Sequence, residues 1–295
     1  MPTLLNHDLL LSFLKKIKLP KNNSRKGDNG KLLIVGGSHL FHAASRWSLD
    51  ISSKLVDMVF YASVPSNNRL IIEAKSHFWN GIVIQRNQVE EYLDEADCVL
   101  IGPGMERSIS KTTTPQNTTS SHLNFPPTDH DWDNSTQTIV NYLLAKYPTK
   151  KWVIDAGALQ MVNPELLTTS CIITPHHKEM EILLNNSKTN TQKNNLYKST
   201  ILLKGEVDEI IHNQKKFCIS GGNSGMTKGG TGDVLAGLVA GLYTNNEILT
   251  STVVASYINK KAGESLYKKS GPFFNATDLV EEIPKLLWRE INLAN

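Results

Sequence analysis

Short apolar segments alternate with segments of helical periodicity along most of this chain. The strand candidates are residues 31–37, 58–63, 98–102, 152–155, 171–174 and 200–204. Helical candidates lie between several of them, at residues 42–55, 136–146 and 178–184. Residues 209–212 and 216–220 predict a hairpin at one edge of the sheet. The alternation predicts an α/β protein whose central, mainly parallel sheet is covered by helices on both faces.

Two polar stretches interrupt this pattern, at residues 106–135 and 185–199. The alternation of strands and helices resumes unchanged after each, so neither is interpreted as a domain linker. We therefore expect one domain over residues 1–295. Within it, residues 1–25 form an N-terminal helix with a basic lead-in, and residues 106–135 form a mobile polar insertion.

The overall composition excludes several classes of protein. A net charge of +3 is too small for a dedicated nucleic-acid surface. The N-terminus lacks the features of a signal peptide, and no apolar run approaches the ~18 residues of a membrane span. The three cysteines, Cys98, Cys171 and Cys218, lie far apart in or beside apolar runs, which favours buried, reduced thiols. We expect a cytoplasmic protein that binds neither nucleic acid nor membrane.

Five of the predicted strands end in unusual turns. These are Gly36-Gly37-Ser38, Gly102-Pro103-Gly104, Asp155-Ala156-Gly157, Thr174-Pro175-His176-His177 and Lys204-Gly205. Ligands of parallel α/β sheets bind at the carboxyl ends of the strands. One such turn is weak evidence, because many strands end in glycine to reverse the chain. Five on one rim, together with the glycine loop before Asp233, predict a ligand pocket there.

Residues 225–241, GMTKGGTGDVLAGLVAG, place a helix directly after a glycine loop. Glycine lets the backbone approach a ligand closely, and a helix N-terminus presents unpaired N–H groups that suit a phosphate. The competing interpretation is that Asp233 only caps the helix, a common role of aspartate. Gly229, Gly230 and Gly232 exceed what a cap needs, so the segment favours an anion site with an acid beside it.

Known nucleotide and metal motifs do not account for these turns. The chain has no P-loop motif, and a dinucleotide fingerprint fails because Leu235 occupies its last glycine position and no clear strand precedes the loop. His176, His177 and Glu179 do not have the spacing of a zinc site. His176 is therefore interpreted as a polar wall of the pocket.

These segments resemble the NAD(P)H-hydrate dehydratase family, whose fold is ribokinase-like, a three-layer α/β/α arrangement. The matching segments are GKLLIVGGS (30–38), IGPGM (101–105), VIDAGAL (153–159), TPHHKEMEILL (174–184), LLKGEVDEI (202–210) and NSGMTKGGTGDVLAGL (223–238). They occur in the family's order and, with ATDLVEEIP (276–284), cover nearly the whole chain.

The resemblance implies an enzyme that removes water from the (S)-hydrate of NADH or NADPH, coupled to cleavage of ADP or ATP. Asp233 would be the catalytic base and would face the hydrate, which Ala43, Gly104 and His176 would also contact. The nucleotide would lie against Lys204, Gly205, Glu206, Val207 and Asp208, with Gly232 at its phosphate. Mg²⁺ would bridge phosphate oxygens with few direct protein ligands, and we expect the chain to form a homo-oligomer.

Three positions depart from the family's usual pattern. Gly157 stands where a second aspartate is frequent, His42 where glycine is common, and Lys228 where a small or apolar residue is usual. Many relatives carry an additional epimerase domain at the N-terminus, and because residues 1–29 are too few for one, we expect the dehydratase domain alone. Two other functions stay open. One is a small-molecule kinase of the same fold that acts on a vitamin precursor or sugar, and the other is a non-enzymatic nucleotide-binding module.

Overall fold

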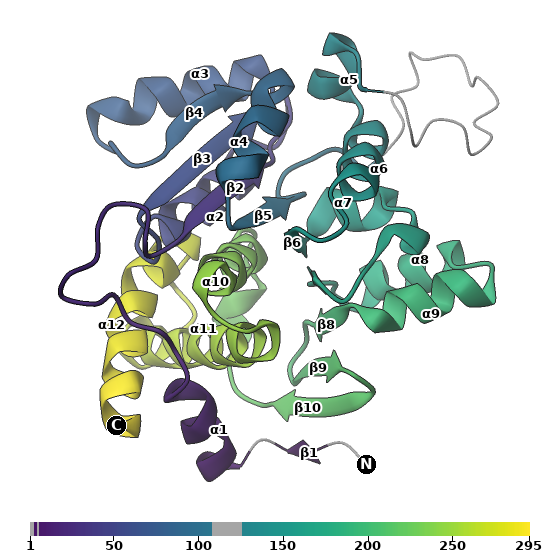
Figure 1. The fold of residues 1–295 in the computed structure, drawn as a ribbon. Coiled ribbons are helices and arrows are strands. Elements are labelled where there is room, and N and C mark those ends of the chain that lie inside the picture. The colour runs from purple at the N-terminus through teal and green to yellow at the C-terminus, as the bar shows by residue number, and fades with distance from the viewer. Residues whose placement is uncertain (1–2, 5, 108–125) are drawn as a thin grey trace.

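The computed structural model describes residues 3–4, 6–107 and 126–295 of the chain (Figure 1). The strands are β1 (Thr3–Leu4), β2 (Lys31–Val35), β3 (Met58–Ser63), β4 (Ile82–Gln85), β5 (Cys98–Ile101), β6 (Lys151–Ile154), β7 (Cys171–Ile173), β8 (Thr200–Leu203), β9 (Asp208–His212) and β10 (Lys215–Ile219). The helices are α1 (His7–Leu14), α2 (Ala43–Ser52), α3 (Pro65–Glu73), α4 (Val89–Glu95), α5 (Asp129–Asn134), α6 (Thr136–Lys146), α7 (Ala156–Met161), α8 (His177–Asn186), α9 (Asn190–Lys198), α10 (Thr231–Asn245), α11 (Ile248–Ser270) and α12 (Ala276–Ala294). Short 3₁₀ helices include η2 (Arg86–Gln88) and η5 (Ser224–Thr227).

The strands of the described residues form one ten-stranded sheet in the order β1-β10-β9-β8-β7-β6-β5-β2-β3-β4. All neighbours pair in parallel except β9, which runs antiparallel to β8 and to β10. The predicted hairpin is therefore confirmed. It does not form the sheet edge, because β1 adds to β10 as a further parallel strand.

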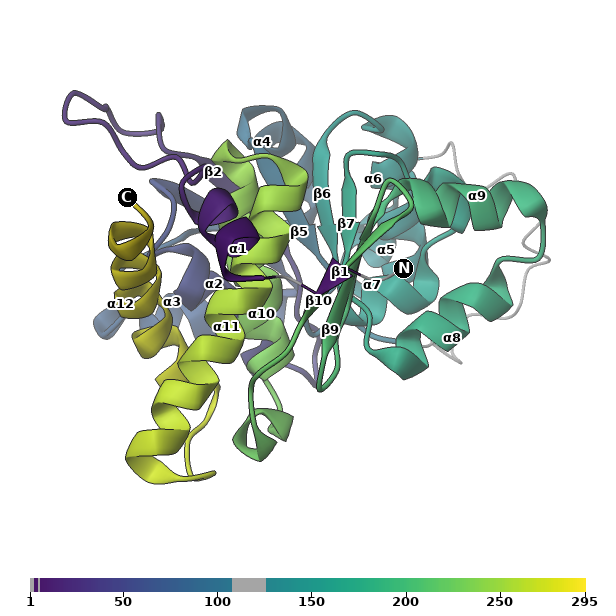
Figure 2. The ribbon, with the colours of Figure 1, turned by 90° about the horizontal axis from the view of Figure 1, so that it is seen from below.

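Each central strand divides its side chains between two hydrophobic cores. In β2, Leu32 and Ile34 belong to one core while Leu33 and Val35 belong to the other, and all four are fully buried. Helices α10, α11 and α12 contribute to the first core, and α4, α6, α7 and α8 contribute to the second. The helices lie on both faces of the sheet in two perpendicular views (Figure 1, Figure 2). The expected three-layer α/β/α fold with a mainly parallel sheet is confirmed.

The direction of strand addition reverses between β2 and β5. From β2 the chain adds β3 and β4 on one side, whereas β5 to β8 add in order on the other side. In open α/β sheets, ligands bind in the crevice at such a switch point, beyond the carboxyl ends of the strands. The glycine turns that follow β2 and β5 therefore lie at the position where this topology places a ligand.

Helices α2 and α10 pack closely because α10 carries glycine at the contact. A Cβ on Gly237 would lie 2.6 Å from Ile51 Cγ2 and 2.7 Å from the Ser48 carbonyl oxygen. At this spacing Ser48 Oγ donates a hydrogen bond to the Asp233 carbonyl at 2.8 Å, and Ser52 Oγ donates to the Gly237 carbonyl at 3.0 Å. The position of the first turn of α10 is thus determined by α2.

Several elements were not predicted from the sequence. Strands β1 and β4 and helices α3, α4, α5 and α9 were missed, and α1 is shorter than the predicted N-terminal helix. The polar stretch 185–199 is largely helical, since Thr189 and Gln192 form a capping box and Leu196 is buried. One buried leucine among polar residues gives too weak a periodic signal for sequence analysis.

The predicted mobile insertion is wrong at its C-terminal end. Residues 129–134 form α5, whose Thr128 caps the first turn through a capping box with Asp131. Trp132 is 5% exposed and packs edge-on against the ring of Tyr142 in α6. Residues 108–125 of the predicted insertion lie outside the described part of the chain.

The α2–α10 contact leads to a stability prediction. Gly237→Ala should lower the free energy of unfolding by about 1–3 kcal/mol, because the added methyl group would clash with α2 although alanine favours the helix. Gly232→Ala in the same helix is the control, since its Cβ would meet only Lys204 Nζ at 3.6 Å. Chemical denaturation of both variants measures the effect. A Gly237→Ala variant as stable as the parent would contradict the close packing.

Candidate active site

The five predicted turns all follow strands whose carboxyl ends share one rim of the sheet. Strands β8, β7, β6, β5 and β2 are consecutive neighbours and run parallel. The rim continues beyond β7 and β8, because His176 and Lys204 form an isolated parallel bridge and Lys204 N–H donates to the Pro175 carbonyl at 2.8 Å. The predicted gathering of these turns is confirmed by the sheet order.

A buried ion pair lies at the centre of this rim. Lys204 Nζ is 2.8 Å from Asp155 Oδ1, and Thr174 Oγ1 donates a hydrogen bond to the same oxygen, also at 2.8 Å. The Asp155 side chain is 2% exposed. Burial acts to lower the pKa of Lys204, but the negative charges of Asp155, Glu179 and Asp233 outweigh it, so the pKa is raised. Lys204 is therefore a charged ammonium at neutral pH.

The backbone packs tightly around Asp155, which explains two glycines. Gly102 has φ of +120°, and a Cβ there would lie 1.9 Å from the Asp155 carbonyl oxygen. A Cβ on Gly157 would lie 2.2 Å from the Met105 carbonyl oxygen. The aspartate that relatives often carry at position 157 does not fit here unless residue 105 moves. The departure at Gly157 therefore follows from the course of the chain after β5.

The glycine loop presents free N–H groups at the start of α10. The N-cap is Gly230, with φ of +95°, and Asp233 lies in the first turn without capping it. Val234 N–H makes the first helical bond, to the Gly230 carbonyl. Among the described residues, the N–H groups of Gly232 and Asp233 have no hydrogen-bond acceptor. With Lys204 Nζ beside Gly232, this corner can bind an anion through one ammonium and two N–H donors.

Asp233 has a pKa close to neutrality. Burial raises the pKa of this carboxyl group to about 7, and the charges of Asp155 and Glu179 add to the effect, against the opposing charges of Lys204 and Arg107. A carboxylate with a pKa near the working pH is suited to accept a proton during a reaction. The alternative that Asp233 is only an N-cap is wrong, because Gly230 occupies that position.

His176 caps α8 and is held by Glu179. The His176 N–H donates to Glu179 Oε2 at 3.0 Å, and the Glu179 N–H donates to His176 Nδ1 at 3.2 Å. The Glu179 side chain is 3% exposed, whereas that of His176 is 47% exposed. The imidazole is therefore held at the rim and is half-exposed, and its role as a polar wall of a pocket stays a prediction.

The loops after β2 and β5 form the other side of the site. Gly104 has φ of +72°, and a Cβ there would lie 2.8 Å from the Phe41 carbonyl oxygen and 3.2 Å from Gly37 Cα. Ala43 begins α2, one residue before Ala44, which also packs on Gly104. Gly104 and Ala43 are thus close together, and α2 connects them to Asp233 through Ser48.

Sequence analysis missed Arg86, a buried residue that supports this side. Its guanidinium donates to the carbonyls of Gly36, at 2.8 Å, and Gly37, and to those of Trp132 and Asp133, each at 3.3 Å. Burial lowers the pKa of Arg86 to about 10, so it stays charged at neutral pH. No sequence signal identified it, because a lone arginine in a polar turn is expected to be exposed to solvent.

Lys228, a second departure from the family pattern, holds the glycine loop to the C-terminal helices. Its ammonium donates to the carbonyls of Pro272 and Phe274, each at 2.5 Å, in the turn between α11 and α12. This turn leads into Asn275, which caps α12. Lys228 therefore anchors the loop to the turn between α11 and α12, and its ammonium is occupied by backbone carbonyls.

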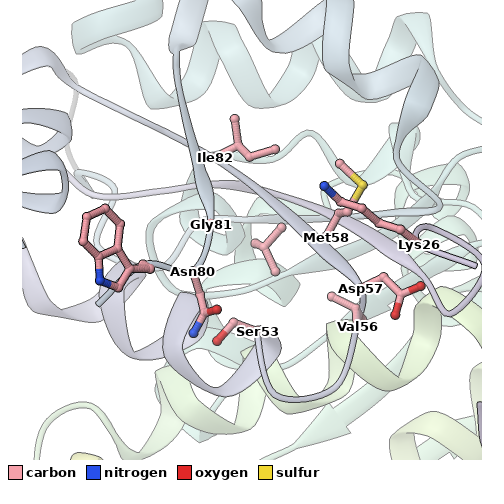
Figure 3. A pocket seen from close by; sticks show the side chains of 10 residues that line it. Lys26, Ser53, Val56, Asp57, Met58, Asn80, Gly81 and Ile82 are labelled. Atoms are coloured by element: carbon pink, nitrogen blue, oxygen red, sulfur yellow. The ribbon is translucent and has the colours of Figure 1, made fainter. Parts of the chain in front are cut away.

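A separate surface pocket lies away from this rim (Figure 3). Its lining includes Asp57 and Met58 at the start of β3 and Gly81 and Ile82 at the start of β4, with Lys26 beside them. These are the amino ends of the strands, opposite the rim that carries Asp233. None of the predicted site residues lines it.

The family model described as NAD(P)H-hydrate dehydratase matches residues 32–285. A bifunctional NAD(P)H-hydrate repair enzyme of Methanocaldococcus jannaschii is 33% identical over 93% of this chain and 51% of that protein. The chain thus spans about half the length of this bifunctional relative. An ADP-dependent (S)-NAD(P)H-hydrate dehydratase of Nitrosopumilus maritimus is 30% identical over 95% of this chain and 96% of that protein.

Solved structures support the same fold. A ribokinase-like superfamily protein of Enterococcus faecalis superposes with a TM-score of 0.74 at 21% identity, over 98% of this chain and 99% of that one. An ADP/ATP-dependent NAD(P)H-hydrate dehydratase of Bacillus subtilis, co-crystallised with ATP and Mg²⁺, superposes with a TM-score of 0.70 at 17% identity, over 98% of each chain.

Within the described residues, no helix is long and apolar enough to cross a membrane.

The raised pKa of Asp233 predicts that this residue costs stability. The carboxyl group ionises near pH 4 when unfolded but near pH 7 when folded, so stability is lost as pH rises through this range. Asp233→Asn should therefore raise the free energy of unfolding above pH 7 by an amount on the order of a few kcal/mol, with no gain near pH 4.

Asp57→Asn is the matched control with the opposite sign. Burial acts to raise the Asp57 pKa, but hydrogen bonds from Asn29 and Gly27 hold it below the usual value. That variant should lose stability at neutral pH. Denaturation of both variants at pH 4 and pH 8 provides the measurement, and an Asp233→Asn variant less stable than the parent at pH 8 would contradict the assigned pKa.

Proposed function

The chain belongs to the NAD(P)H-hydrate dehydratase family, and from that premise we propose that it dehydrates the (S)-hydrate of NADH or NADPH with ADP or ATP as co-substrate. The geometry at the start of α10 carries this proposal. There, a carboxyl group with a pKa of about 7 stands beside two free N–H donors and the ammonium of Lys204. This combination is suited to phosphoryl transfer to a hydroxyl group.

The two substrates would occupy opposite sides of this corner. The hydrate would lie against Ala43, Gly104 and His176, with its hydroxyl group directed to Asp233. The nucleotide would lie along residues 204–208, with its terminal phosphate at Gly232. The supporting observation is that Lys204, the first residue of the 204–208 loop, places its ammonium beside the first turn of α10, where a Cβ on Gly232 would lie 3.6 Å from Nζ.

The first step would convert the hydroxyl group into a better leaving group. Asp233 accepts the proton from the C6 hydroxyl, whose oxygen attacks the terminal phosphorus of the nucleotide. The bond from that phosphorus to the bridging oxygen breaks and releases the shortened nucleotide. Lys204 and the N–H groups of Gly232 and Asp233 stabilise the negative charge of the moving phosphoryl group.

The second step would eliminate phosphate. The lone pair of the ring nitrogen forms a double bond into the ring as the C6–O bond breaks, and loss of a ring proton restores the dihydropyridine. His176 and Gly104 would orient the ring for this step. Free phosphate and NADH or NADPH are the products, so atoms and charge balance without an oxidant or reductant.

Mg²⁺ fits this site mainly through the nucleotide. Among the described residues there is no group of three His, Cys, Asp or Glu side chains that could hold a metal ion. The Asp155 carboxylate is occupied by Lys204 and Thr174, and that of Glu179 by the His176 backbone. When bound, Mg²⁺ would neutralise phosphate charge. The single domain, the cytoplasmic location and the homo-oligomeric state stay predictions.

The direct test is recovery of the reduced nicotinamide absorbance from hydrated NADH in the presence of ADP or ATP. The wild-type protein should release one free phosphate for each NADH recovered. Asp233→Asn should lower turnover by about 10²-fold or more, since the proton acceptor is lost, while nucleotide affinity is retained. A stable phosphorylated product would instead indicate a small-molecule kinase. Unchanged turnover of the variant would rule out Asp233 as the base.

The pH dependence tests the electrostatics of the site. Since Asp233 must be deprotonated, kcat/KM should rise through about pH 7. The charge of Asp155 raises the Asp233 pKa, so Asp155→Asn should move this limb to lower pH. Glu179→Gln should move it in the same direction but less. A limb that stays in place in both variants would show that another group controls the rate.

A further inference from the structure

Lys260, in the middle of α11, lies beneath the loop proposed to hold the nucleotide. Its side chain is 7% exposed. Its ammonium donates to the carbonyls of Gly205 at 2.9 Å, Glu206 at 3.0 Å and Gly221 at 3.2 Å, and it pairs with Asp208 Oδ1 at 3.3 Å. One buried cation therefore holds two successive carbonyls of the 204–208 loop and one carbonyl that follows β10.

This arrangement also determines the direction of the N–H groups in the peptide units whose carbonyls bind Lys260. In a trans peptide the carbonyl and the following N–H are directed to opposite sides. Because the carbonyls of Gly205 and Glu206 point inward to Lys260, the N–H groups of Glu206 and Val207 point outward. Within the described chain neither donates a hydrogen bond to a protein acceptor, and both residues are exposed. Two successive outward N–H groups without protein acceptors can donate to an anion.

Asp208 locks this conformation from the same side. Its Oδ1 accepts from Gly205 N–H at 3.0 Å, and its Oδ2 accepts from Ser256 Oγ at 2.7 Å. With Lys260 as its ion partner, the carboxylate is engaged at both oxygens and is directed into the protein. Asp208 therefore shapes the loop from within, although it was predicted from the family motif to line the nucleotide.

We propose that Lys260 is a positioning residue for nucleotide binding, which holds the loop so that the N–H groups of Glu206 and Val207 receive the polar groups of a nucleoside di- or triphosphate. The inference rests on the proposed function, because it needs a nucleotide at this loop. Lys260 does not touch the reacting atoms. Its loss should weaken nucleotide binding and leave the chemical step unchanged once nucleotide saturates.

Lys260→Met tests the proposal, and Lys151→Met is the matched control. Lys151 also donates to two successive carbonyls, those of Tyr243 and Thr244, but at the amino end of β6, on the opposite rim. Both variants lose a lysine that donates to backbone carbonyls, Lys260 being buried and Lys151 half-buried, so both should lose thermal stability. Only Lys260→Met should weaken ADP binding, by about tenfold or more, because part of the binding free energy is then used to order the loop. Calorimetry measures the dissociation constants.

Steady-state kinetics should show the same separation. For Lys260→Met, KM for the nucleotide should rise about as much as its dissociation constant, while KM for the hydrate and kcat at saturating nucleotide stay near those of the parent. If Lys260→Met does not fold, Lys260→Arg decides, since it keeps the charge opposite Asp208 but its planar guanidinium cannot meet the three carbonyls as the ammonium does.

Two results would overturn the inference in different ways. A folded Lys260 variant that binds ADP as tightly as the parent, or weakened binding to the same degree in Lys151→Met, would overturn it alone. Wild-type protein that does not bind ADP or ATP would overturn both this inference and the proposed function.

Discussion

The ion pair between Lys204 and Asp155 is the contact on which the arrangement of the rim depends. It joins the ends of β8 and β6 across β7, and Thr174, the residue that follows β7, donates to the same carboxylate. A buried ammonium without this partner would be strongly unfavourable. Because Asp155 compensates its charge, Lys204 can lie next to Gly232 and give the start of α10 a fixed positive charge. The anion site is therefore a product of three strands and one helix.

The same electrostatic arrangement sets function against stability. Asp155 and Glu179 lie near Asp233, and their charges add to burial in raising the pKa of Asp233 to about 7, although the charge of Lys204 opposes them. A neutral residue at position 233 would make the folded protein more stable at neutral pH. Local rules that are broken without structural gain are characteristic of functional sites. The unfavourable ionisation of Asp233 in this sense supports the proposal that the chemistry takes place there.

Much of the fold could be predicted because its signals are local. Strands β2, β5, β6, β7 and β8 each contain a continuous apolar run that ends in a turn, so their shared rim followed from parallel pairing alone. Strand β4 was missed because Ile82 at its start is exposed and its apolar run is short. Helix α9 buries one leucine and is otherwise polar.

The site was predicted less completely, because its supporting residues act through the backbone. Asp233, Lys204 and His176 lie in sequence motifs. Arg86 and Lys260 do not, since each donates to carbonyl oxygens, which every residue carries. No pattern of side chains therefore marks their partners. Such contacts depend on the distant segments that folding brings together, and they become visible only in the structure.

The close contact between α2 and α10 has a consequence for motion. Serine hydroxyl groups of α2 donate to carbonyls of α10 on the face where Gly237 removes any side chain. Ala43 begins α2 and Asp233 lies in the first turn of α10, so these contacts hold the two residues in a fixed relation to one another. In the proposed reaction, the geometry between hydrate and base is then set before either substrate arrives. The base and the hydrate contact therefore lose little rotational freedom on the way to the transition state. The entropy cost of aligning these two groups has already been offset by folding.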